Sequence, residues 1–175
     1  GIKTEDEKAM EQVETFWKAE SEFKRGLAIF NQGRVGQAHE FFAKAHQAVP
    51  EELEFRAYYA FTSFKKSHGR DEEAAEAAKE SLKEVLDKNQ EQARKLDAAW
   101  VLMGIVYRDT GSDTAAKKCF VQALKINPSN ADAPREMRRI TGGAPGGGKK
   151  SGGKREAAKA PGFFARLFGG GKKKS

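Results

Sequence analysis

One segment of the sequence resembles a nucleotide-binding motif. Residues 143–150, Gly-Ala-Pro-Gly-Gly-Gly-Lys-Lys, differ from a phosphate-binding loop at one key position, where Lys150 replaces the Ser or Thr that would hold magnesium. The sequence predicts no strand before this segment and no firm helix after it, so the backbone N–H groups would not be held around a phosphate. Nucleotide binding is therefore not expected.

The histidines and the cysteine do not form a reactive or metal-binding group. His39 and His46 are seven residues apart, about 10.5 Å along a helix, which is too far for them to share a metal ion. Cys119 is the only cysteine, which excludes a disulfide framework and a thiolate zinc site, and its place before Phe120 favours a small buried apolar side chain. We expect no catalytic site, no cofactor and no enzymatic activity.

The positive charge lies at the C-terminal end. The 175 residues carry a net charge of +7, but residues 141–175 alone hold nine basic side chains and one acidic one, which leaves −1 for the rest. A nearly neutral main domain argues against nucleic-acid binding. The longest apolar run, residues 98–103, is too short to span a bilayer, and the start shows no signal peptide. We expect a cytoplasmic protein, and the initial Gly1 suggests a fragment of a longer one.

The C-terminal tail, residues 141–175, is rich in glycine and lysine, and we expect it to be disordered. It ends in large apolar side chains that would share one side of two helical turns, followed by a cluster of lysines. Three roles stay open: weak contact with an anionic membrane surface, a linear motif for another protein or for this chain's own groove, and a solubilising tail. The residues of this tail motif are Phe163, Phe164, Arg166, Leu167, Phe168, Lys172, Lys173 and Lys174.

The main part of the chain contains an internal repeat. Six pairs of identical residues are 78 positions apart, which equals two periods of 34 plus ten extra residues, and this predicts three repeats with a longer middle one. Each unit is predicted to form two helices joined by a short turn, with small residues where the helix backbones approach. The recurring pairs are Gly26 and Gly104, Gly33 and Gly111, Ala38 and Ala116, Phe42 and Phe120, Ala45 and Ala123, and Pro50 and Pro128.

This pattern resembles the tetratricopeptide repeat (TPR) family, closely over residues 97–130 and more weakly over residues 19–52. The resemblance implies an all-α solenoid of three helix-turn-helix repeats, the middle one degenerate and longer. We expect an N-terminal helical extension at residues 1–18, the TPR domain with a capping helix at residues 19–140, and the tail after it. The capping helix, residues 133–140, has Asp132 as its expected N-cap and Pro134 in its first turn.

The resemblance also implies a function and a site. TPR proteins usually bind other proteins, so the expected function is that of a non-enzymatic scaffold or adaptor that holds a partner in a concave groove. We expect this groove to be apolar and open, with Phe61 and Phe64 as anchors for the partner. The family's groove positions fall on Glu20, Phe23, Leu27, Phe30, Asn31, Glu54, Ala57, Phe61, Phe64, Lys65, Val101, Ile105, Arg108 and Asp109.

One ligand class is excluded by the same carry-over. A TPR subclass grips acidic chaperone tails with Lys, Asn and Arg side chains, but the corresponding positions here hold Phe23, Leu27, Tyr58, Ala98 and Leu102. The expected partner is therefore a helix or an apolar peptide. The alternative is a tether that acts mainly through its basic, aromatic tail on a membrane surface or nucleic acid. A weaker third reading is self-association through Phe16, Trp17 or the groove.

Overall fold

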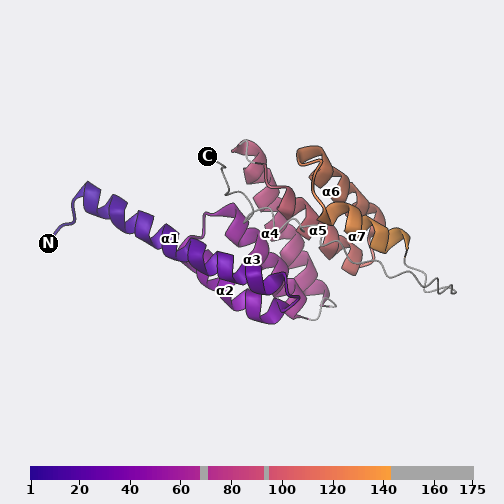
Figure 1. Ribbon diagram of the computed structural model, residues 1–175, viewed down its shortest axis with the longest axis horizontal. Helices are drawn as coiled ribbons and strands as arrows, with labels where there is room; N and C mark the ends of the chain where they lie inside the picture. Colours follow the sequence, from indigo (N-terminus) through magenta and orange to yellow (C-terminus); the bar gives the residue numbers. More distant parts are fainter. Residues whose placement is uncertain (68–70, 93–94, 143–175) are drawn as a thin grey trace, which may run out of the picture.

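The computed structural model describes residues 1–67, 71–92 and 95–142, and these residues form helices and connecting turns without a strand (Figure 1). The all-α expectation is confirmed. The helices are α1 (Glu5–Phe30), α2 (Val35–Ala48), α3 (Leu53–Lys66), α4 (Glu72–Glu91), α5 (Asp97–Asp109), α6 (Asp113–Ile126) and α7 (Asp132–Thr141).

Consecutive helices pack as hairpins, α1 with α2, α3 with α4 and α5 with α6, and α7 packs against α5 and α6 at the end of the stack (Figure 1). The predicted three repeats and terminal helix are therefore present. The turns of the first and third hairpins have the same geometry, because Gly33 and Gly111 have φ values of 77° and 85°. Residues other than glycine rarely adopt this left-handed backbone conformation, so the recurring glycines end α1 and α5.

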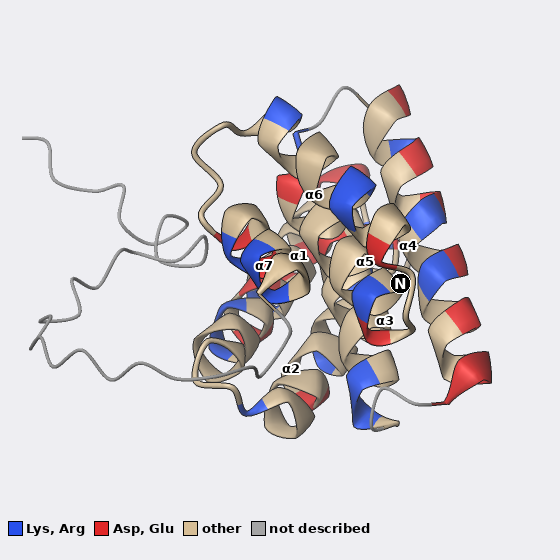
Figure 2. Ribbon diagram, turned by 90° about the vertical axis from the view of Figure 1, so that its right-hand side faces the viewer, with Lys and Arg blue, Asp and Glu red and all other residues tan. Residues whose placement is uncertain are grey.

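The middle repeat absorbs part of its extra length in a longer second helix. α4 has 20 residues, whereas α2 and α6 have 14 each. Asp71 begins α4 by accepting hydrogen bonds from the backbone N–H groups of Glu73 and Ala74. Acidic and basic side chains alternate along its outer side (Figure 2), which fits a helix face in contact with water.

The start of α7 differs from the expectation. Asp132 lies inside the helix, and Asn130 performs the capping, because its Oδ1 accepts from the backbone N–H groups of Asp132 and Ala133 at 3.0 and 2.8 Å. The Asn130 amide also donates to Asp97 Oδ2 at 2.9 Å, as does the amide of Asn127. The buried Asp97 at the start of α5 therefore fixes the turn that leads into α7.

The N-terminal extension and the first repeat helix form one continuous helix, so the expected boundary at residue 18 falls inside α1. A capping box between Thr4 and Glu7 begins this helix. Residues 5–18 are all exposed, and burial starts at Ala19. The first half of α1 therefore extends away from the body of the protein, at the left of Figure 1.

Candidate protein-binding surface

Side-chain contacts place α1, α3 and α5 side by side, and we call their common surface the α1/α3/α5 face. The ring of Phe30 in α1 lies 5.8 Å from that of Phe61 in α3, and Lys65 Nζ in α3 lies 2.7 Å from Asp109 Oδ2 in α5. Every groove position expected from the sequence lies on these helices or, for Asn31, at the C-terminal cap of α1.

The floor of this face is closed. Phe61 is 3% exposed and Phe64 is 0% exposed, so neither ring offers a surface to a partner, and the expectation of exposed anchors at these two positions is corrected. Both phenylalanines belong to the buried core of the stack. The remaining predicted floor positions that are buried are Phe23, Leu27, Ala57 and Val101.

Ring packing explains this closure. Phe30 lies 6.0 Å from Phe42 and 5.7 Å from Tyr58, both in edge-on contacts, and Phe23 lies 5.3 Å from Tyr58. Aromatic rings at these distances stabilise one another beyond the area that they bury. The sequence showed the aromatic residues, but the neighbour that each ring would contact depends on how the hairpins stack.

The predicted positions that keep some exposure are mostly polar and lie around the floor. Asn31 is exposed, and two apolar and five charged side chains are partly exposed. Those partly exposed side chains are Phe30, Ile105, Glu20, Glu54, Lys65, Arg108 and Asp109.

One margin of the face is fixed by a chain of ion pairs from α3 to α7. Lys65 pairs with Asp109, Asp109 Oδ1 lies 3.0 Å from Arg108, and Arg108 pairs with the buried Glu136 of α7. Burial alone would lower the pKa of the Arg108 guanidinium, but its hydrogen bonds and charge pairing with Glu136 and Asp109 raise that pKa above its ordinary value. Arg108 therefore stays charged and tied to α7. Sequence reasoning did not find Glu136.

The five positions that correspond to an acidic-tail clamp are buried. Phe23, Leu27, Tyr58, Ala98 and Leu102 have exposed fractions of 0 to 4%, and the Tyr58 hydroxyl contributes the one polar side-chain atom among them. Burial raises the pKa of that hydroxyl well above its ordinary value, so it stays neutral. None of these side chains supplies a positive charge to a carboxylate.

A hollow of about 560 Å³ lies between α2, α3 and α4. Tyr59 and His46 line it, and the ring of Tyr59 stacks on two histidines of α2, with centroids 5.3 Å from His39 and 4.9 Å from His46. Burial lowers the pKa of both histidines, the charge of Lys66 lowers that of His39 further, and Arg56 does the same for His46. No sequence signal pointed to this hollow, because its walls come from three helices.

Several expectations concern other chemistry. Within residues 1–67, 71–92 and 95–142, no three His, Cys, Asp or Glu side chains are grouped so as to hold a metal ion, and no helix is long and apolar enough to cross a membrane. Cys119 is buried, and burial raises the pKa of its thiol to about 11, which fits the predicted apolar role. The segment 143–150 and the tail motif, residues 163–174, lie outside the described residues.

The chain is similar in structure to two solved TPR domains. The first TPR domain of Spaghetti (RPAP3), bound to the HSP90 peptide SRMEEVD, is 20% identical, with a TM-score of 0.53 over 73% of this chain and 94% of that one. The TPR2AB domain of yeast Sti1, in complex with pHSP90, is 16% identical, with a TM-score of 0.53 over 72% of this chain and 47% of that one. At these identities the similarity establishes the fold.

The sequence comparisons identify one repeat of this type. The tetratricopeptide repeat family model matches residues 97–130, the segment that carries the strongest motif. No curated protein matches the sequence closely enough to be counted as a relative. The chain therefore contains a tetratricopeptide repeat at residues 97–130 and has the overall fold of tetratricopeptide-repeat domains.

Proposed function

We propose that this protein is a non-catalytic adaptor that binds a helix or an apolar peptide of another protein across the α1/α3/α5 face. The observation that carries the proposal is the composition of that face. Its accessible part combines the half-buried Phe30 and Ile105 with a polar margin that ends in the Lys65–Asp109 ion pair. An apolar centre with a polar rim is typical of surfaces that bind proteins.

The solved TPR domains with this fold favour a peptide as the ligand, since the structure of the RPAP3 domain contains a bound peptide, SRMEEVD. The chemistry of the ligand must differ here. That peptide carries two glutamates, an aspartate and a C-terminal carboxylate, whereas the five clamp positions of this chain are apolar or neutral. An apolar segment would meet no unpaired charge on the floor, while an acidic one would lose its hydration without compensation.

A pair of matched variants tests the site. Ile105 is half-buried on the face, and Val121 is an exposed apolar residue of α6 outside it. Proteins captured from an extract by the full chain are compared with those captured by Ile105→Glu and by Val121→Glu. The proposal expects a partner that is lost with Ile105→Glu and retained with Val121→Glu. Partners retained by both variants, or lost equally from both, would contradict it.

A titration tests the ligand class directly. The synthetic peptide SRMEEVD is added to the full chain and binding is followed by calorimetry. We expect no binding at peptide concentrations up to about 1 mM, a free energy no more favourable than about −4 kcal/mol. Micromolar affinity for this peptide would overturn the assignment to apolar ligands.

A further inference from the structure

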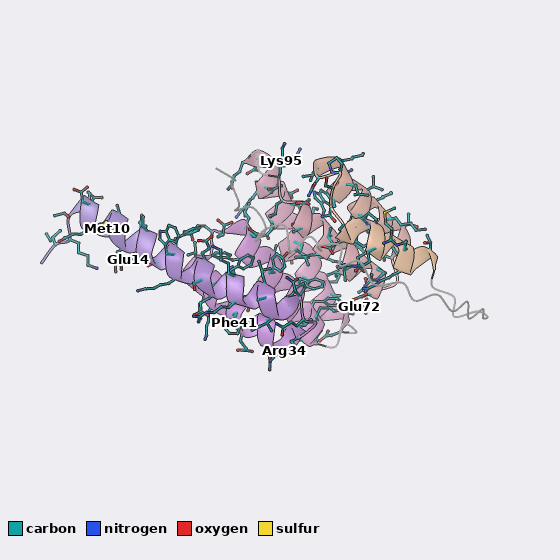
Figure 3. The ribbon with its side chains drawn as sticks, viewed as in Figure 1. Met10, Glu14, Arg34, Phe41, Glu72 and Lys95 are labelled. Atoms are coloured by element: carbon teal, nitrogen blue, oxygen red, sulfur yellow. The ribbon has the colours of Figure 1, made fainter. Side chains whose placement is uncertain are left out.

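The first half of α1 carries apolar side chains that no described part of the chain covers. Met10, Val13 and Trp17 are 66, 53 and 64% exposed. Met10 and Glu14 are labelled on this extending segment in Figure 3, away from the packed hairpins. Single exposed apolar residues are normal on protein surfaces, but here three lie at intervals of three and four residues, so they share one side of the helix.

These three residues belong to a longer row with the spacing of a coiled-coil seam. The row, which we call the α1 row, alternates steps of four and three residues over six positions, and each of its members is exposed or half-exposed. It is separate from the side of α1 that packs against α2 and α3, where Ala19, Phe23 and Leu27 are buried. The members of the α1 row are Asp6, Met10, Val13, Trp17, Glu20 and Lys24.

The charges of α1 are arranged so that the helix complements itself. Its first turn holds Glu5, Asp6 and Glu7, whereas Lys24 and Arg25 lie towards its other end, where they pair with Glu20 and Glu22 of the same helix at 3.0 and 3.7 Å. Two such helices in antiparallel orientation bring Asp6 of each copy beside Lys24 of the other. We propose that α1 is the interface of a homodimer in which two copies pack antiparallel along the α1 row.

One register satisfies every position of the row. In this register the residue numbers of two facing residues add up to 30. Val13 therefore faces Trp17 of the second copy, and Asp6 faces Lys24 of the second copy. Met10 then lies over the aliphatic part of Glu20 of the second copy. Each residue at heptad position a then faces a residue at position d of the second copy, as in an antiparallel coiled coil. The axis of symmetry passes at the level of Thr15.

The same register places one unfavourable contact at the centre. Glu14, directly next to Val13, would lie beside its own counterpart across the symmetry axis, and like charges at such a distance repel. The paired stretch is also short, roughly 27 Å at 1.5 Å per residue. A contact of this size gives a weak dimer, with a dissociation constant of roughly 10 µM to 1 mM.

Sedimentation equilibrium of the full chain over a range of concentrations tests the dimer. Val13→Glu is expected to weaken association at least tenfold, and Val121→Glu, at an exposed valine of α6, is expected to leave it unchanged. A wild-type chain that stays monomeric at millimolar concentration would overturn the proposal, as would a Val13→Glu chain that associates like the wild type.

Variants that gain or regain association test the register independently of folding. Glu14→Gln removes the repulsion at the axis, so it is expected to tighten the dimer several-fold. Asp6→Lys and Lys24→Glu are each expected to weaken it because they create like-charge pairs, and the double variant restores opposite charges and with them the affinity. Singles that weaken association without rescue in the double, or no gain with Glu14→Gln, would refute the antiparallel register.

One further variant separates a second copy of α1 from the chain's own tail as the occupant. Serine replaces Phe163, Phe164, Leu167 and Phe168 in the full chain. The dimer through α1 is expected to keep its dissociation constant in this variant. If the substitutions abolish association, the tail is the occupant and the proposal is wrong.

Discussion

The ring of Phe120 lies against the α-carbon of Gly104, so closely that a Cβ atom on this glycine would stand 2.4 Å from Phe120 Cε1. The first repeat has the same arrangement, with 2.7 Å between a Cβ on Gly26 and Phe42 Cε1. Phe42 and Phe120 are fully buried, so neither ring has room to move aside. The glycine and the aromatic ring of each hairpin therefore determine together how closely its two helices approach.

This contact predicts a measurable loss of stability in Gly104→Ala. Forcing a methyl group into a packed core typically costs about 1–3 kcal/mol, which exceeds the gain of about 1 kcal/mol from the better helix propensity of alanine. The free energy of unfolding in urea is expected to fall by up to about 2 kcal/mol on balance. Gly36→Ala is the control, because a Cβ at Gly36 meets no atom within 4 Å. Equal effects of the two substitutions would rule out the steric explanation.

The sequence predicted the fold because its pattern records contacts within each hairpin. Gly104, Phe120 and Gly111 are close in sequence, and the spacing of such residues depends on local helix and turn geometry. The burial of the α1/α3/α5 face was not predictable in this way. Phe61 is closed in by Phe30 of the preceding hairpin, a contact that depends on the angle between repeats. No local spacing records that angle.

Truncation of Phe64 is expected to affect folding rather than binding alone. Its side chain is completely buried, so Phe64→Ala should lower the free energy of unfolding by about 3–5 kcal/mol. Trp17 is a larger side chain but 64% exposed, and Trp17→Ala should cost less than about 1 kcal/mol at concentrations where the chain is monomeric. Urea unfolding of both variants at low protein concentration measures the difference. A small effect at Phe64 would mean that its ring is accessible after all.

Asn130 lies in a turn, yet we expect its substitution to lower the stability of the fold. Its side chain caps α7 through two backbone N–H groups and donates to the buried Asp97. Asn130→Ala removes all three bonds and should lower the free energy of unfolding by about 2 kcal/mol. Asn31→Ala, at an exposed asparagine, should change it by less than about 0.5 kcal/mol. Similar results for the two asparagines would contradict this role.

Asn130 also shows why the polar contacts that hold α7 in place could not be predicted from the sequence. Asn127 and Asn130 lie 30 and 33 residues after Asp97, and polar residues at that distance give no periodic signal. The same holds for Arg108 and Glu136, which lie 28 residues apart and join α5 to α7. The position of Arg108 followed from the repeat pattern, whereas its partner could be identified only once α7 was placed on the stack.

The two histidines around Tyr59 predict how stability depends on pH. Their pKa values in the folded protein are lowered, mainly by burial, so the unfolded chain binds protons more readily than the folded one. Stability is therefore complete above the unfolded value of about 6.5 and falls as the pH drops through it towards the folded values. The exposed carboxylates Glu11 and Glu40 also have lowered pKa values, but their contribution to the stability of the fold is lost only as the pH falls below about 4.5. Urea unfolding at pH 7.5 and 5.5 should show a loss for the wild type and a smaller loss for His39→Gln, His46→Gln. An equal loss in the double variant would show that other groups cause the dependence.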